Sequence, residues 1–302
     1  MSATHHPDVS NVPAIEFRNV SLSFDGKAAL RDVSFILPRG EMVVLTGESA
    51  SGKSVLLHLA IGLLKPDEGE IFVDGREIES LEEEELLAIR GGLMGMVFQE
   101  DALFTGMSVY DNTAFRLVEH GWPESDVSRI VTEVLNFVDL ADDKDLMPEE
   151  LSGGMKRRLE IARALVGWPS IMLYDEPTYA LDPIIAGQVL DLIIRARDVH
   201  HISSFYVTKE LHEIAYLARR CAFTDRNGVV TVTDVERDQE LPLRVMLLED
   251  GAIVFFDTRR KFEESALPVV THLTHPAKER PIVDFYIPDP WSKRRKPREK
   301  IL

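Results

Sequence analysis

Residues 47–54 combine two glycines, a lysine and a serine at a spacing that suits phosphate binding. The apolar run at 42–45 predicts a buried strand before this loop, and the apolar stretch at 55–64 predicts a helix after it. Gly47 and Gly52 allow the backbone to curl, so that successive N–H groups face one anion at the helix N-terminus. Lys53 would reach the β- and γ-phosphates, and the Ser54 hydroxyl could hold Mg²⁺. A plain glycine turn is the alternative, but the Lys-Ser pair and both flanks favour a nucleoside triphosphate.

Polar side chains of three further segments could complete this chemistry. Asp175 and Glu176 end an apolar strand, where Asp175 would support Mg²⁺ and Glu176 would act as the general base toward water. Gln99 ends another apolar strand and could reach Mg²⁺ or the attacking water, or it is a surface residue. Ser152 is a suitable N-cap, and the two glycines after it expose backbone N–H groups as a second anion site. Asp175 and Glu176 alone could also be a helix cap.

The elements that must position these residues follow from periodicity. Alternating apolar residues at 15–24, 29–37 and 70–73 predict antiparallel strands beside the phosphate loop. Four glutamates at 82–85 predict a solvated helix face, and residues 106–168 are mainly helical in pattern. Farther on, strands alternate with helices, which predicts a mostly parallel α/β sheet with its ligands at the carboxyl ends of the strands. These later segments are strands at 171–174, 203–208, 229–232, 243–248 and 253–256, and helices at 183–196 and 211–219.

Composition limits the class of protein. The 302 residues carry a formal net charge of −17, which argues against non-specific nucleic-acid binding because phosphates need basic surface. The one cysteine, Cys221, can form neither an intrachain disulfide nor a cysteine-based metal site. No run of about 18 apolar residues occurs, and residues 1–13 have the composition of a flexible leader rather than a secretory signal. We therefore expect a soluble intracellular protein.

At these motifs the chain resembles the nucleotide-binding subunit of an ABC transporter. Residues 47–54 match Walker A, Gln99 matches the Q-loop, residues 151–155 match the signature, 171–176 match Walker B and 180–182 match the D-loop. The resemblance implies a P-loop cassette over residues 14–260, with an antiparallel β subdomain and a helical subdomain at about 100–168, and an extension at 261–302. It implies ATP and Mg²⁺ as ligands. The implied catalytic residues are Glu176, Gln99 and Lys209, the Mg²⁺ ligands Ser54, Gln99 and Asp175, and the nucleotide-binding residues Phe24, Gly47, Glu48, Ser49, Ala50, Ser51, Gly52, Lys53, Ser54, Ser152, Gly153, Gly154 and Asp182.

The resemblance also implies partners. In this family two cassettes pair head to tail, and each ATP lies between one Walker A loop and the signature of the other chain. The sequence has one of each, so we expect a second ATPase subunit, as a homodimer, and a separate transmembrane permease at the cytoplasmic face of an inner membrane. A non-transport ATPase that acts on a division-type membrane protein would share every motif. A scaffold that binds ATP and hydrolyses it weakly is a further alternative.

Residues 99–112, together with 146–148, look like the Mla/Mce-type lipid-transport ATPases. In ABC proteins this region grips the permease, so the likeness implies phospholipid transport and a lipid-binding Mce-type partner. Residues 102–107 of this segment are apolar, and simple packing is the alternative.

Three features depart from the family pattern. Lys209 stands where the family has a switch histidine, and it can donate to phosphate but cannot relay a proton as a neutral imidazole. We expect slow hydrolysis or an asymmetric dimer, with His212 either a surface residue or a partial substitute. Residues 226–245 are long for their place and suggest an extra hairpin. The basic end of the tail at 268–302 could contact lipid headgroups or a neighbouring copy, or could be a disordered solubilising tail.

Overall fold

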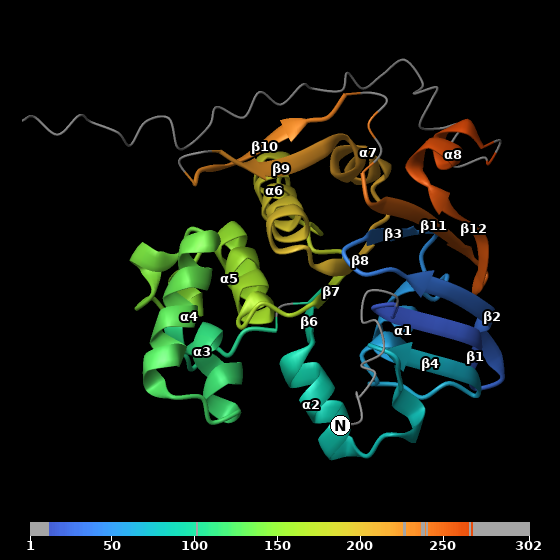
Figure 1. The fold of residues 1–302 in the computed structure, drawn as a ribbon, viewed down its shortest axis with the longest axis horizontal. Helices are drawn as coiled ribbons and strands as arrows, with labels where there is room; N and C mark the ends of the chain where they lie inside the picture. Colours follow the sequence, from blue (N-terminus) through green and yellow to red (C-terminus); the bar gives the residue numbers. More distant parts are fainter. Residues whose placement is uncertain are drawn as a thin grey trace, which may run out of the picture.

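The centre of the molecule is a six-stranded sheet with the order β12–β11–β3–β8–β7–β6 (Figure 1). The computed structural model describes residues 12–100, 102–225, 228–236, 239, 241–265 and 267. Five neighbouring strands run parallel and β12 pairs antiparallel with β11, which confirms the predicted α/β fold. The strands are β3 (Met42–Thr46), β6 (Met94–Val97), β7 (Ile171–Asp175), β8 (Ser203–Val207), β11 (Leu243–Glu249) and β12 (Ala252–Thr258).

Both faces of this sheet are covered, so its central strands are buried throughout. Successive side chains of β3 enter different cores, because a strand projects alternate residues to opposite faces. Val44 packs in the core that contains helices α5 (Gly153–Leu165), α6 (Pro183–His200) and α7 (Leu211–Arg219). Val43 and Leu45 pack in the core that contains α1 (Lys53–Ala60) and the antiparallel strands. The continuous apolar run that predicted β3 thus reflects burial on two sides.

The second core lies under an antiparallel sheet of order β2–β1–β4–β5, on the right in Figure 1. Asp25 and Gly26 both have positive φ, as a two-residue hairpin turn between β1 and β2 requires. Ile15 pairs with Leu37 on one side and Val73 on the other, which places the apolar faces of three strands together. The strands are β1 (Ile15–Phe24), β2 (Lys27–Leu37), β4 (Glu68–Val73) and β5 (Arg76–Glu77).

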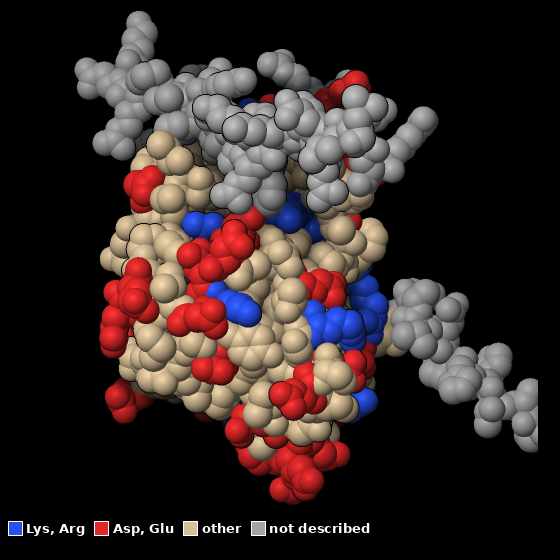
Figure 2. Space-filling view, turned by 90° about the vertical axis from the view of Figure 1, so that its left-hand side faces the viewer, with Lys and Arg blue, Asp and Glu red and all other residues tan. Residues whose placement is uncertain are grey.

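Helices α3 (Val109–Glu119), α4 (Glu124–Phe137) and α5 form a helical unit on the left of Figure 1. The glutamate run belongs to α2 (Glu83–Gly92), where Glu82 and Glu85 form a capping box and the carboxylates are exposed, as predicted. Viewed from the side of the helical unit, acidic side chains are scattered over the surface and basic ones form smaller groups (Figure 2). Short 3₁₀ helices lie at Ile78–Ser80, Ala141–Asp143 and Pro148–Glu150.

Two predicted helix ends are wrong. The helix after the phosphate loop ends at Ala60 rather than near residue 64, because Gly62 has φ +70° and turns the chain although its neighbours are apolar. Helix α6 continues past residue 196 to His200, and His201 ends it in the left-handed conformation. Apolar periodicity located both helices but not the residues that stop them.

The hairpin expected at 226–245 lies earlier in the chain. It consists of β9 (Arg220–Thr224) and β10 (Val230–Asp234), and it packs on α6. The earlier start follows from Arg220, which begins β9 directly where α7 ends and whose guanidinium donates to the Tyr216 hydroxyl.

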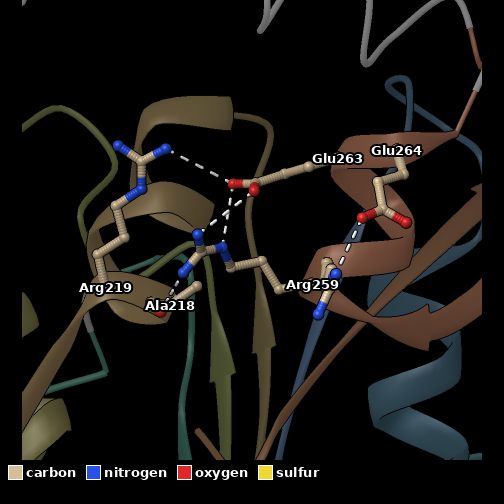
Figure 3. Close-up of polar contacts among 6 residues, drawn as sticks. Ala218, Arg219, Arg259, Glu263 and Glu264 are labelled. Carbon is tan, nitrogen blue, oxygen red and sulfur yellow. Dashed lines mark hydrogen bonds and ion pairs between the residues drawn. The ribbon is translucent and has the colours of Figure 1, made fainter. Parts of the chain in front are cut away.

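Helix α8 (Arg259–Glu264) docks on the end of α7 (Figure 3). Arg259 donates to the carbonyl of Ala218 and to Glu263, and Arg219 lies 3.6 Å from the same carboxylate. Phe262 is buried in the core. The boundary predicted at residue 260 falls inside this helix, whose packing is described as far as Ser265. The expected leader (apart from residues 12 and 13), Asp101 and the tail at 268–302 lie outside the described residues.

Candidate functional site

The phosphate loop runs from the end of β3 to the start of α1. Gly47 has φ +150°, and a Cβ there would lie 2.2 Å from the carbonyl oxygen of Leu248. Gly52 has φ +103°, and its Cβ would lie 2.5 Å from the carbonyl oxygen of Ala29. Both glycines are therefore required by close backbone contacts as well as by dihedral angle. In the described chain no side chain caps α1, which leaves its first N–H groups available to an anion.

Lys53 is the buried cation of this loop. Its side chain lies across the loop, with Nζ donating to the carbonyl oxygens of Gly47 at 2.9 Å and Glu48 at 2.6 Å. The residue is 5% exposed, and burial lowers the pKa of its ammonium group. Carbonyl oxygens carry only partial charge, so an anionic phosphate would be a stronger partner for the ammonium. Glu48, Ser49 and Ala50 are exposed at the rim, and Ser51 is buried beside Lys53.

Asp175 and Ser54 fit a Mg²⁺ ion. Asp175 is 4% exposed at the end of β7, and its carboxylate lies close enough to the Ser54 hydroxyl for that group to act on its pKa. Its Oδ1 atom is buried and has no hydrogen-bond partner among the described residues. Burial raises the pKa of this carboxyl. An unsatisfied carboxylate oxygen next to a hydroxyl is the oxygen donor set that Mg²⁺ prefers, and such a cation would offset the cost of burying the charge.

Glu176 and Lys209 meet at the carboxyl ends of neighbouring strands. Glu176 directly follows β7, has φ +47°, and its N–H donates to the carbonyl of Val207 on β8. Its Oε1 atom lies 2.9 Å from Lys209 Nζ. The left-handed conformation of a non-glycine residue costs about 1–3 kcal/mol and is maintained by its surroundings. The expected base and the unusual switch-position lysine thus form an ion pair. His212 is exposed and lies 3.6 Å from Glu210, as expected for a surface histidine.

The signature residues lie at a different place. Ser152 caps α5 by accepting the N–H of Met155, and Ser152 and Gly153 are exposed. Gly154 is buried against Ile185, where a Cβ would lie 2.7 Å from the side chain. Asp182 caps α6 through the N–H groups of Ile184 and Ile185. The signature therefore packs beside the start of α6, and none of the hydrogen bonds of its described residues reaches the phosphate loop.

Two further expected site residues carry no charge. Phe24 ends β1 and is 45% exposed, so its ring is open to stacking. Gln99 is half-buried after β6, and its carbonyl oxygen accepts from Arg157 Nη2 at 3.3 Å. The structure thus brings together Lys53, Ser54, Asp175, Glu176 and Lys209, which we call the phosphate-facing cluster.

The prediction from sequence missed Glu213. This buried carboxylate on α7 accepts the hydroxyls of Thr178, Tyr206 (2.9 Å) and Thr208 (2.6 Å), and it is 2% exposed. These four residues form what we call the hydroxyl network. Thr178 lies two residues after Glu176 and Thr208 lies one before Lys209, so the network fixes both backbones. A carboxylate at a helix position in phase with buried apolar residues was the available signal.

Residues 30–179 match the family described as ABC transporter. The methionine import ATP-binding protein MetN of Carboxydothermus hydrogenoformans is 40% identical over 227 residues, which cover 73% of this chain and 67% of that protein. A Mycobacterium leprae protein named "Probable ribonucleotide transport ATP-binding protein mkl" is 45% identical over 182 residues, which cover 60% and 52%. The chain thus spans about two thirds and about half of the lengths of these relatives.

Solved structures agree with the fold. The dimeric post-hydrolysis structure of the ATP-binding cassette MJ0796, bound to ADP and Pi, matches with a TM-score of 0.67 at 26% identity, covering 81% of this chain and 98% of that one. The cbiO1 protein of Clostridium perfringens, described as part of the complex cbiONQ, matches with a TM-score of 0.70 at 24% identity, covering 88% and 97%. The second likeness concerns the fold alone.

Proposed function

The chain belongs to the ABC transporter family of ATP-binding cassettes, and on that premise we propose that it is the ATPase subunit that drives a separate membrane permease. Cassettes of this family bind ATP with Mg²⁺ and hydrolyse it. The observation that supports the proposal is the ion-paired Glu176 beside Lys53 and the unsatisfied Asp175 oxygen, all at one edge of the sheet. None of the helices in the described part of the chain has the length and apolar character to cross a bilayer.

The proposed mechanism follows from the charges of the cluster. The loop N–H groups and Lys53 would hold the β- and γ-phosphates, and Ser54 and Asp175, with Gln99, would hold Mg²⁺. The bound Mg²⁺ supplies neutralisation of the phosphate charge. Glu176 accepts the proton of the attacking water. This residue is only 8% exposed, so few bulk water molecules can hydrogen-bond to its carboxylate in place of the attacking water. Lys209 leaves Glu176 for the γ-phosphate, because the phosphate offers more negative charge than one carboxylate.

We propose that two copies pair head to tail. In one chain the signature packs beside the start of α6 and is exposed at Ser152 and Gly153, so it is available to nucleotide held by a second chain. The dimeric form of the matched cassette MJ0796 supports pairing. Pairing would also place Asp182 and the exposed Tyr179 near the second chain. The paired cassettes would then act at the cytoplasmic face of a membrane, on a permease that this chain does not contain.

For the cargo we propose phospholipid, on the likeness of residues 99–112 to lipid-transport ATPases. Asn112 is fully buried and makes hydrogen bonds to the backbone of Phe104 and Met107. These bonds hold this part of the segment in one conformation, as a surface that docks on a specific permease should be. A lipid-binding Mce-type protein would complete such a transporter. Methionine is a second candidate for the cargo, because the chain is 40% identical to a protein named as a methionine import ATP-binding protein, MetN.

One purification tests function and cargo together. The tagged chain is extracted from native membranes in mild detergent, and its ATP turnover, co-purifying proteins and bound lipids are measured. A multispanning permease with bound phospholipid and a lipid-binding partner supports the lipid proposal. If a permease co-purifies and methionine changes the ATP turnover of the complex, phospholipid is rejected as the cargo, and the proposal that the chain drives a transporter stands. A division-type membrane protein, or ATP binding with negligible turnover, rejects the transporter in favour of a mechanical ATPase or a scaffold.

A further inference from the structure

We propose that Arg157 is a positioning residue that couples the two nucleotide sites of the paired cassettes. It would do so by fixing the Q-loop (residues 98–104, of which Asp101 is outside the described residues) to the signature helix α5. The inference rests on the proposed pairing of two copies. The proposed contact would allow nucleotide binding at one site to change the conformation of the other site.

Arg157 contacts the Q-loop through both prongs of its guanidinium. Nη1 donates to the carbonyl oxygen of Phe98 at 2.8 Å, and Nη2 donates to that of Gln99 at 3.3 Å. Nη1 also lies 2.6 Å from Oε2 of Glu160, one turn farther along α5. The side chains of Arg157 and Glu160 are 9% and 8% exposed, so this charge pair is shielded from water. Because Glu160 is on the same helix, it holds the guanidinium in place whatever the Q-loop does.

A second arginine of α5 contacts the same loop farther along. Arg163 donates to the carbonyl oxygen of Ala102, and its guanidinium lies 4.0 Å from the centroid of the Phe104 ring. That ring packs on Phe115 of α3, with centroids 4.6 Å apart. The described parts of the Q-loop on both sides of Asp101 are therefore each attached to α5, and a shift of the helix would displace both.

The two ends of this connection serve different nucleotide sites. Ser152 caps the N-terminus of α5 and lies about 7.5 Å along the helix axis from Arg157, at 1.5 Å per residue. In the proposed pair Ser152 would face the ATP held by the second chain, whereas Gln99 would face the Mg²⁺ held by its own chain. A shift of α5 on engaging the second chain's ATP would displace the carbonyls of Phe98 and Gln99 and thereby the Gln99 amide. One guanidinium would thus transmit a binding event from one site to the other.

The chemistry of the contact requires arginine. A planar guanidinium can donate in fixed directions to two carbonyls and a carboxylate at once, whereas lysine offers a point charge on a flexible stem. Arg157→Lys therefore keeps the charge beside Glu160 and removes the two-pronged grip. Lys156→Ala is the matched control. It removes a positive charge from the adjacent position of α5, and the Lys156 side chain makes no hydrogen bond or ion pair within the described part of the chain.

The test compares full-length wild type, Arg157→Lys, Arg157→Ala and Lys156→Ala. Binding isotherms with a non-hydrolysable ATP analogue give the Hill coefficient, and hydrogen exchange of the nucleotide-free protein reports on residues 98–104. We expect a Hill coefficient between 1 and 2 for wild type and the control. In both Arg157 variants it falls to about 1, affinity for the second nucleotide drops about fivefold or more, and exchange in the Q-loop accelerates. First-site affinity stays within about twofold in Arg157→Lys.

Two results would overturn the inference. In one, the Arg157 variants lose thermal stability while the Hill coefficient and the exchange of the Q-loop match wild type, which would leave Arg157 with a structural role only. In the other, Lys156→Ala lowers the Hill coefficient equally, which would assign the effect to charge. A wild type that binds ATP but neither pairs nor shows a Hill coefficient above 1 contradicts the proposed pairing instead, and the coupling falls with it.

Discussion

Two groups of polar residues lie at the same edge of the sheet and are satisfied to different degrees. In the phosphate-facing cluster, Lys53 donates mainly to carbonyl oxygens and one carboxylate oxygen of Asp175 has no partner within the described chain. In the hydroxyl network, the carboxylate of Glu213 accepts three hydroxyl groups. The two carboxylate residues, Asp175 and Glu213, are both buried, at 4% and 2% exposure.

The difference separates residues that await a ligand from residues that hold them in place. A buried charge without a partner destabilises the ligand-free protein. A bound cation or phosphate removes this destabilisation, and the free energy gained contributes to the affinity for the ligand. A satisfied buried carboxylate instead fixes the backbones beside it. Substitutions in the cluster should therefore change catalysis and binding, and substitutions in the network should change stability first.

The largest effect should come from Glu176→Gln. The amide keeps the shape but cannot accept a proton, so we expect turnover to fall by about 10²–10⁴-fold with ATP affinity retained. Steady-state ATPase assays and equilibrium nucleotide binding measure the two quantities. The role of Glu176 as the base is wrong if turnover of the variant stays within a few-fold of wild type.

Next, Glu213→Ala should destabilise the nucleotide-free protein by about 3–5 kcal/mol, because it removes a buried acceptor and leaves three hydroxyl donors without it. Chemical denaturation provides the free energy of unfolding. A matched control is Glu210→Ala, an exposed carboxylate three residues earlier, which should change stability by less than about 1 kcal/mol. Equal effects of the two variants would remove the distinction between the network and the surface.

Asp175→Asn should act in the opposite direction on stability. The carboxylate is buried without full compensation, so the neutral amide should leave the free energy of unfolding unchanged or raise it. The Mg²⁺-dependent part of ATP affinity should fall by about 10–100-fold. Nucleotide titrations with Mg²⁺ and with a chelator separate the two. Clear destabilisation of the metal-free protein would show that Asp175 is structural.

The network also predicts a pH dependence. Burial, followed by the nearby Glu213 charge, raises the pKa of the Tyr206 hydroxyl well above 10. Above pH 10 the unfolded chain loses this proton while the folded protein keeps it, so stability present below pH 10 is lost as pH rises. Tyr206→Phe should reduce this slope by about 1.4 kcal/mol per pH unit. The free energy of unfolding of wild type and Tyr206→Phe, measured from pH 9 to 11, tests this prediction. The other buried tyrosines contribute the same pH dependence to both proteins and cancel in the comparison.

The smallest stability effect should belong to Lys209. Its side chain is 39% exposed, so loss of the ion pair with Glu176 should cost less than about 1 kcal/mol. Lys209→His should nevertheless raise turnover by about tenfold, equivalent to about 1.4 kcal/mol in the barrier, because a neutral imidazole can relay a proton at this position and a lysine cannot. If turnover is unchanged, the lysine does not limit the rate.

The sequence determined the parts that are local. A phosphate loop needs two glycines, a lysine and a serine in a fixed order between a strand and a helix, so residues 47–54 and the residues after residue 174 could be located from spacing. Buried strands with apolar residues on both faces, and helices with one apolar face, likewise follow from periodicity.

Only the tertiary structure decided which distant residues meet. Parallel pairing places β8 between β3 and β7, and this order brings Lys209 to Glu176 and Glu213 to Thr178, residues 33 and 35 positions apart. The contact of Arg157 with Phe98 spans 59 positions in the same way. Strand order is set by how the two cores fill and not by any short segment, so neither the hydroxyl network nor the grip on the Q-loop could be predicted from the sequence alone.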